Sequence, residues 1–146
     1  MKTAMKTKKP SLSKAKQKAW AVFSLYIRTK GWMEYKAMHP EYNGEPVAQC
    51  VTCKRIFPIK QLHAGHFVAG RTNAVLFDER GVHPQCYRCN VGEHGNPLNY
   101  WLFMEEKYGR PVIDELMAQR NQTLKMKVWD YDELRDKYQE LLASLT

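Results

Sequence analysis

The sequence contains no run of the roughly 18 consecutive apolar residues that a membrane-spanning helix needs. Its basic start, MKTAMKTKKP, is followed by no apolar segment of the kind found in secretory signal peptides. Cysteine is scarce too, at four in 146 residues. These absences argue against a membrane or secreted protein and favour an intracellular one. In a reducing compartment, cysteines bind metal more often than they form disulfides.

Acidic residues are nearly missing from the first quarter of the chain. Residues 1–36 hold ten Lys or Arg and one acid, Glu34, for a net charge of +9. Residues 37–146 hold thirteen basic and fourteen acidic residues, for a net charge of −1. A concentrated basic arm favours a polyanionic partner, most often nucleic acid, although charge alone also allows a solubilising tail. The predicted DNA-binding residues are Lys14, Lys16, Lys18, Arg28, Lys30, Arg71 and Arg88.

The order of helical and strand-like segments predicts an α+β fold in a single domain. Residues 1–12 are expected to form a disordered basic tail, and residues 13–146 to fold together. Within that domain we expect a basic helix over 13–36, a small zinc-stabilised core over 48–108 and further helices over 109–146. The flanking helices would therefore enclose the core from both ends of the sequence.

The predicted first helix carries an apolar stripe. Trp20, Phe23 and Ile27 fall at helical spacing, so we expect them to pack into the core rather than stack on nucleic-acid bases. Gly31 is a candidate for the end of this helix, since glycine often terminates helices. The lysines of the early turns are then the better candidates for phosphate contacts.

The four cysteines form two matched pairs. Cys50 and Cys53 make one CxxC, Cys86 and Cys89 make another, and 32 residues separate them. Each pair can place two thiolates on one tetrahedral Zn²⁺ with bonds of about 2.3 Å. Four sulfurs leave no open coordination position, so the pattern predicts a closed, structural zinc site. Such a site can supply much of the folding free energy of a small domain.

Three of the five histidines, His63, His66 and His83, lie between the cysteine pairs. A neutral imidazole can bind a metal or act as a general base near neutral pH. Phosphodiester hydrolysis needs an activated water and a cation such as Mg²⁺ or Mn²⁺. Asn90 directly follows a predicted zinc ligand, which would fix it in place to offer an amide oxygen to that second metal. The cluster predicts a hydrolytic site with His66 as general base.

Together these segments resemble a ββα-metal (HNH-type) nuclease motif and, more narrowly, the phage NinG/Rap recombination protein family. The matching pieces are KAWAVFSLYIR, CVTC, HAGHF, LFDERGVHPQCYRCN, GN and YWLFMEEKYG. The resemblance covers about residues 15 to 140. It implies a zinc-stabilised ββα-metal core flanked by helices, in a structure-selective endonuclease acting on branched DNA such as Holliday junctions and D-loops. The implied location is the cytoplasm of a phage-infected or prophage-carrying bacterial host.

The resemblance also assigns roles to single residues. His66 matches the general base and Asn90 the residue that binds the catalytic Mg²⁺ or Mn²⁺, while the four cysteines match the structural zinc. The sequence departs from the broader pattern at two positions: Gly65 stands where an Asp usually binds metal, and Gly81 where an Asn usually braces the base. His83 and His63 are therefore the first candidates for a second protein ligand of the catalytic metal. Asp78 and His94 are the next candidates. His83 thus joins His66 and Asn90 in the predicted catalytic group.

Two other functions fit parts of the pattern. A non-catalytic zinc module that binds nucleic acid would need the cysteines and lysines but neither His66 nor Asn90. A zinc-stabilised scaffold for a recombination or replication partner would use the acidic C-terminal helix. If the substrate is a symmetric DNA branch, a homodimer is favoured, and the C-terminal helices could supply its interface.

Overall fold

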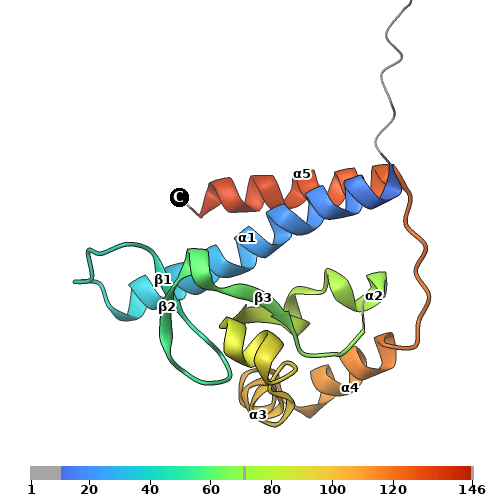
Figure 1. Cartoon of the computed structure of the whole chain (residues 1–146). Coiled ribbons are helices and arrows are strands. Elements are labelled where there is room, and N and C mark those ends of the chain that lie inside the picture. The colour runs from blue at the N-terminus through green and yellow to red at the C-terminus, as the bar shows by residue number, and fades with distance from the viewer. Residues whose placement is uncertain (1–10, 71, 146) are drawn as a thin grey trace, which may run out of the picture.

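The computed structural model describes residues 11–70 and 72–145. Most of the predicted basic tail, residues 1–10, and the predicted DNA contact Arg71 lie outside the described residues. The described chain is an α+β fold in which helices surround two small sheets, so the predicted fold class is confirmed at this level (Figure 1). None of the helices in the described ranges is long and apolar enough to cross a membrane.

The first helix, α1 (Leu12–Met38), is longer than the sequence suggested. The Ser11 side chain accepts a hydrogen bond from the Lys14 backbone N–H and caps its start. Gly31 does not end it. A Cβ at Gly31 would lie 2.9 Å from Pro84 Cγ and 3.0 Å from the Ala48 Cβ. The glycine therefore serves close packing of α1 on the strands, and the prediction of a helix end there is wrong.

Each sheet has two antiparallel strands. One sheet pairs β1 (Val47–Gln49) with β2 (Ile56–Pro58). The other pairs β3 (His63–His66) with β4 (Val82–Gln85), so that Gly65 lies opposite His83 and His66 opposite Val82. Because side chains alternate between the two faces of a strand, this register decides which histidine faces which helix.

The remaining elements are helical. The short helix α2 (Asn73–Leu76) lies in the connection between β3 and β4, and the 3₁₀ turns Ile59–Gln61 and Glu79–Gly81 flank those strands. A π-helical turn, Arg88–Gly92, follows β4. Three longer helices come after it: α3 (Pro97–Tyr108), α4 (Arg110–Gln119) and α5 (Val128–Ser144). Asp130 lies in the first turn of α5, where its carboxylate accepts the Lys127 backbone N–H.

Apolar side chains gather in three clusters around these elements. In the largest, Phe23 and Tyr26 of α1 both contact the ring of Tyr138 on α5, which fixes α5 along α1 (Figure 1). A second cluster joins Tyr100 and Met104 of α3 to α4. The third surrounds the cysteines. The β3–β4 sheet thus has α1 on one face and α3 on the other, and the four cysteines lie at its end.

Candidate functional site

The four cysteines come together from two separate loops. Cys50 and Cys53 lie in the turn between β1 and β2, and Cys86 and Cys89 lie where β4 passes into the π-helical turn. Their four sulfurs lie within 4.8 Å of one another, and the Sγ atoms of Cys53 and Cys86 are 3.8 Å apart. Tetrahedral bonds of about 2.3 Å place two thiolates about 3.8 Å apart. The cluster can therefore hold a metal such as zinc, as the spacing predicted.

The surroundings of these sulfurs favour a bound cation. Burial raises the pKa of Cys50, but hydrogen bonds from the Cys53 backbone and the Thr52 hydroxyl outweigh it and lower that pKa to about 6. Burial, together with the neighbouring Cys50 sulfur, raises the pKa of Cys53 to about 12. Several thiolates cannot coexist at this distance without a positive charge between them, and a divalent metal supplies one.

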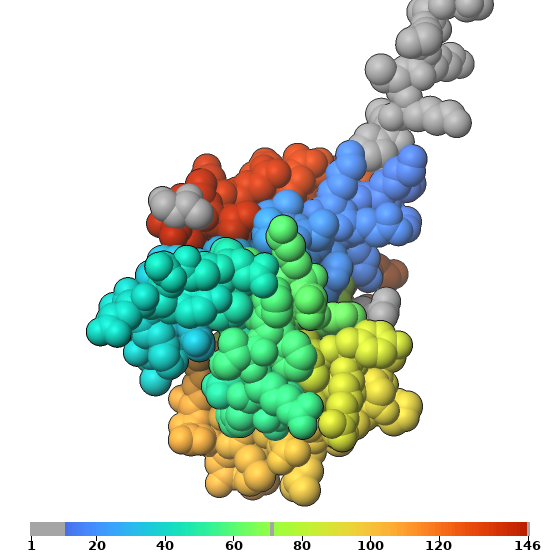
Figure 2. Space-filling model, turned by 60° about the vertical axis from the view of Figure 1, so that its left-hand side comes forward, coloured from blue at the N-terminus to red at the C-terminus, as the bar shows by residue number. Residues whose placement is uncertain are grey.

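A second group of predicted residues lines an open pocket of about 730 Å³ beside α1. His63, His66 and Asn90 all lie on its wall. Figure 2 shows the elements that border it on one face of the molecule: α1 in blue, the segment around residue 60 in green and the segment around residue 90 in yellow-green. The structure therefore brings together three residues that are up to 27 positions apart in the sequence.

Two contacts fix the ring of His66. Its Nε2 lies 3.1 Å from the Leu76 carbonyl oxygen, which can only accept, so Nε2 carries the proton. The ring also stacks on Trp20 of α1, with centroids 5.1 Å apart and planes 18° from parallel. Nδ1 is then the nitrogen with a lone pair for a proton. An imidazole held in one tautomer and one orientation has the properties of a general base.

Asn90 and His63 contact each other directly. The Asn90 amide nitrogen Nδ2 lies 3.2 Å from His63 Nδ1. The backbone N–H of Asn90 donates to the Cys86 carbonyl at 2.9 Å, which ties the residue to the cysteine cluster. With Nδ2 directed at His63, the amide oxygen is the atom of Asn90 left to bind a cation. His63 and Asn90 thus form a donor pair anchored to the cysteine cluster.

The pocket is basic. Lys16 and Arg28 line it from α1 and Lys60 from the opposite wall, and none of its described lining residues is Asp or Glu. Arg28 is held in place, since its Nη1 donates to the Ile59 carbonyl at 3.0 Å. Three cations without a carboxylate attract a phosphate. Lys60 was not among the predicted DNA contacts, because nothing local in its sequence links it to α1.

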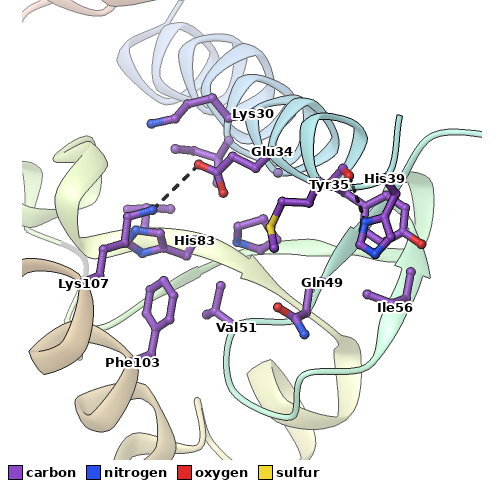
Figure 3. A pocket seen from close by; sticks show the side chains of 15 residues that line it. Lys30, Glu34, Tyr35, His39, Gln49, Val51, Ile56, His83, Phe103 and Lys107 are labelled. Atoms are coloured by element: carbon purple, nitrogen blue, oxygen red, sulfur yellow. Dashed lines mark hydrogen bonds and ion pairs between the residues drawn. The ribbon is translucent and has the colours of Figure 1, made fainter. Parts of the chain in front are cut away.

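His83 lies elsewhere. It pairs with Gly65 across the sheet, so its side chain points to the α3 face, opposite to His66. There it is buried, with Nδ1 3.2 Å from the Tyr100 hydroxyl and Nε2 2.9 Å from the Tyr108 hydroxyl. Figure 3 shows it beside Phe103 and Lys107 in a different pocket, of about 220 Å³. The structure therefore does not bring His83 to His66 and Asn90.

The burial of His83 leads to a prediction of how the stability of the protein changes with pH. Burial, together with Lys107 and Lys30, lowers its pKa from 6.5 to about 3. Below pH 6.5, His83 binds a proton in the unfolded chain, where its pKa is ordinary. In the folded chain it stays neutral until the pH approaches 3. Stability is therefore expected to fall from pH 6.5 toward pH 3, by up to about 1.4 kcal/mol per pH unit, and not to change through this group above pH 6.5.

Urea unfolding of the wild type and a His83→Gln variant over this range tests the assignment. The variant cannot take up the proton, so the difference in unfolding free energy between the two proteins should shrink as the pH falls. All other titrating groups are shared and cancel in that difference. Parallel losses of stability in both proteins would contradict the assignment.

The structure explains the glycine at position 65, one of the two that depart from the nuclease pattern. A Cβ at Gly65 would lie 2.7 Å from Cδ of Gln85, a buried side chain held by bonds to Thr52 and Gly95. An Asp therefore has no room at position 65. Gly81 ends a tight turn, and the Leu76 carbonyl takes the place of a bracing side chain at His66.

The two more distant candidates for a metal ligand do not join this site either. Asp78 pairs with Arg80, at 2.9 Å between the carboxylate and the guanidinium. His94 is exposed and does not line the pocket of His66. His63 is therefore the one predicted second ligand that lies beside Asn90.

The other predicted DNA contacts are dispersed. Lys14 and Lys18 are exposed on α1, and Lys16 and Arg28 line the basic pocket. Lys30 lies in the pocket of His83, 4.0 Å from Glu79. Arg88 is exposed and pairs with Glu93 at 3.3 Å. The basic face is thus centred on the first half of α1 and continues past Lys60.

Comparisons with known proteins agree on one family. A family model described as Bacteriophage Lambda NinG protein matches residues 2–146. Protein ninG of Escherichia phage 933W is 32% identical over 103 residues, which are 66% of this chain and 47% of that protein. The ninG proteins of Salmonella phage P22 and Escherichia phage lambda are 31% and 29% identical with the same coverage. The chain spans about half the length of these curated relatives. No solved structure matches it.

Proposed function

The chain belongs to the NinG family of lambda-like phages, and from this premise we propose that it is a divalent-metal-dependent DNA endonuclease. The observation that carries the proposal is the basic pocket in which His66, held in one tautomer, lies with the His63–Asn90 pair. A non-catalytic binding module would have no use for an oriented imidazole next to an amide anchored to a metal cluster. The pocket therefore favours hydrolysis over binding alone.

The local fold supports a ββα-metal (HNH-like) core. Two antiparallel strands, β3 and β4, are followed by the helical turn Arg88–Gly92 that carries Asn90. In this interpretation the four cysteines hold a structural Zn²⁺ that fixes the end of β4 and the start of that turn. The zinc takes no part in the reaction, because four thiolates leave it no open position.

In the proposed reaction, His66 acts as the general base. Its Nδ1 takes a proton from a water molecule that attacks the scissile phosphorus, and the Nε2 bond to Leu76 keeps the ring in place. Lys16, Arg28 and Lys60 hold the phosphate and its neighbours, so binding weakens as the salt concentration rises. The bond between phosphorus and the 3′-oxygen then breaks, and that oxygen takes a proton from solvent water, which leaves one 5′-phosphate end and one 3′-hydroxyl end.

Asn90 would hold the catalytic ion through its amide oxygen, together with water and the DNA phosphate. His63 would join it through Nδ1 once the Asn90 Nδ2–H that now points at that nitrogen has turned away. When bound, that ion neutralises charge on the phosphate and on the leaving oxygen. An amide oxygen and an imidazole fit a divalent transition metal such as Mn²⁺ better than Mg²⁺, which prefers carboxylates. His83, buried between two tyrosines, is left out of this set.

We extend the proposal to branched DNA, such as Holliday junctions and D-loops formed in phage recombination. The exposed lysines of α1 lie next to the basic pocket, so both would contact phosphates near the cut. On a symmetric junction two copies would cut opposite strands, which makes a homodimer on DNA part of the proposal.

The test is cleavage of end-labelled DNA. A four-way junction and a linear duplex of the same sequence are incubated with the zinc-loaded protein in Mn²⁺, in Mg²⁺ or without any added divalent ion. We expect the junction to be cut in preference to the duplex, faster in Mn²⁺ than in Mg²⁺ and not at all without an added ion. Binding to both DNAs without cleavage in either metal would overturn the proposal and leave the non-catalytic zinc module as the function.

A further inference from the structure

Tyr87 is an exposed aromatic residue beside the proposed active site. It lies between two zinc-binding positions, Cys86 and Cys89, and 63% of its surface is open to solvent. Its ring meets the ring of His63 edge-on, with centroids 5.9 Å apart and planes 64° apart. The proposed reaction makes no use of it.

A second hollow begins on the other side of Tyr87. It has a volume of about 620 Å³, and part of its wall is formed by the cysteine cluster. Its other lining residues include two cations, Arg55 and Arg88, and the amides of Gln61 and Asn99. Its one acidic residue among the described lining residues, Glu93, already pairs with Arg88 at 3.3 Å. The hollow is thus polar and slightly basic. Tyr87 lines it and also contacts His63, which lines the pocket of His66.

We propose that Tyr87 stacks on an unpaired nucleobase next to the scissile phosphate, and that the second hollow takes the nucleotide beyond it. The proposal rests on the endonuclease function above and names its substrate class: DNA in which the strand at the cut leaves the duplex. Base stacking on an aromatic ring needs an open π-face, which a continuous base-paired stack does not offer.

Two properties of Tyr87 suit this role. Its backbone lies between cysteines of the cluster and its ring contacts His63, so less order has to be gained when the ring holds a base. Its neighbours on both sides are cations and amides, which match the phosphates and base edges of a single strand. The exposed aromatic residue Trp129 of α5 lacks these neighbours: it is 58% exposed and lines neither hollow.

The test measures binding without cleavage. All proteins carry His66→Ala and are kept free of chelator and without added Mn²⁺ or Mg²⁺, with their zinc content checked. The DNA is a duplex with a short single-stranded gap, with 2-aminopurine at one gap position at a time, compared with the intact duplex. The variants are Tyr87→Ala, Tyr87→Phe, which keeps the ring, and Trp129→Ala as the matched exposed aromatic.

We expect stacking on Tyr87 to quench 2-aminopurine at one gap position. Tyr87→Ala should lose that quenching and bind gapped DNA about 10-fold more weakly, with less than about a twofold change on intact duplex. Tyr87→Phe and Trp129→Ala should behave like their parent. Unchanged quenching in Tyr87→Ala, or an equal loss on both DNAs, would overturn the inference.

The two proposals can fail separately. If the gap-specific effect is seen but the wild type never cuts DNA, the stacking role stands and the nuclease function fails. If the wild type cuts DNA but Tyr87→Ala binds gapped DNA as its parent does, the nuclease function stands and the stacking role fails.

Discussion

A His66→Ala variant is expected to cut DNA about 10² to 10⁴ times more slowly than the wild type, since this is the usual contribution of a positioned general base. The loss should appear in the rate at saturating protein and not in DNA affinity, because the cations that hold phosphate, Lys16, Arg28 and Lys60, are untouched. Single-turnover cleavage at several protein concentrations separates the two quantities. Free imidazole added to the variant should restore part of the rate.

A control is needed because His66 also packs against Trp20 and bonds to the Leu76 carbonyl. Circular dichroism and zinc content should match the wild type in His66→Ala. His39→Ala removes an exposed histidine from the end of α1, outside the basic pocket, and should cut at the wild-type rate. If His66→Ala cuts as fast as His39→Ala, His66 is not the general base.

Short-range patterns in the sequence predicted much of the site. The matched CxxC spacings indicated a sulfur cluster because two cysteines three positions apart can bring their sulfurs together within a single turn of backbone. Asn90 could be placed near that cluster because it is the next residue after Cys89. The general-base role of His66 is still a prediction, but its position in one pocket with His63 and Asn90 agrees with it.

What the sequence could not supply was the contact between distant segments. His83 was grouped with His66 by distance along the chain, whereas the pairing of Gly65 with His83 turns it to the opposite face. Trp20 has the spacing of a core residue, yet its ring lies partly open against His66. Both outcomes depend on strand register and helix placement, which local spacing does not determine.

The helix boundaries show the same limit. Gly31 was expected to end α1 from the intrinsic preference of glycine. In the fold, the missing side chain instead allows the helix to approach Pro84 and Ala48. A glycine that allows close packing cannot be told from a glycine that ends a helix by its neighbours in the sequence. Pro84, which packs against Gly31, is more than 50 residues further along the chain.

Cys86→Ser is expected to abolish zinc binding and unfold the segment around the cluster. Cys86 is buried, and its Sγ lies 3.8 Å from that of Cys53. Structural zinc sites in small domains contribute about 10–16 kcal/mol of apparent binding free energy. A domain of this size is typically stable by only about 5–15 kcal/mol, so losing the site removes most or all of that margin. Zinc content, and thermal unfolding followed by circular dichroism, measure both effects.

Phe57→Leu provides the matched control for that experiment. Phe57 packs against the same cluster without supplying a sulfur, so the variant should keep one zinc per chain and lose only a small part of its thermal stability. A chelator should reproduce the effect of Cys86→Ser in the wild type and in Phe57→Leu. A Cys86→Ser protein that lacked zinc but unfolded at the wild-type temperature would show that the cluster does not hold the fold. Because the backbone N–H of Asn90 bonds to the Cys86 carbonyl, loss of the cluster should also displace the His63–Asn90 pair and stop cleavage.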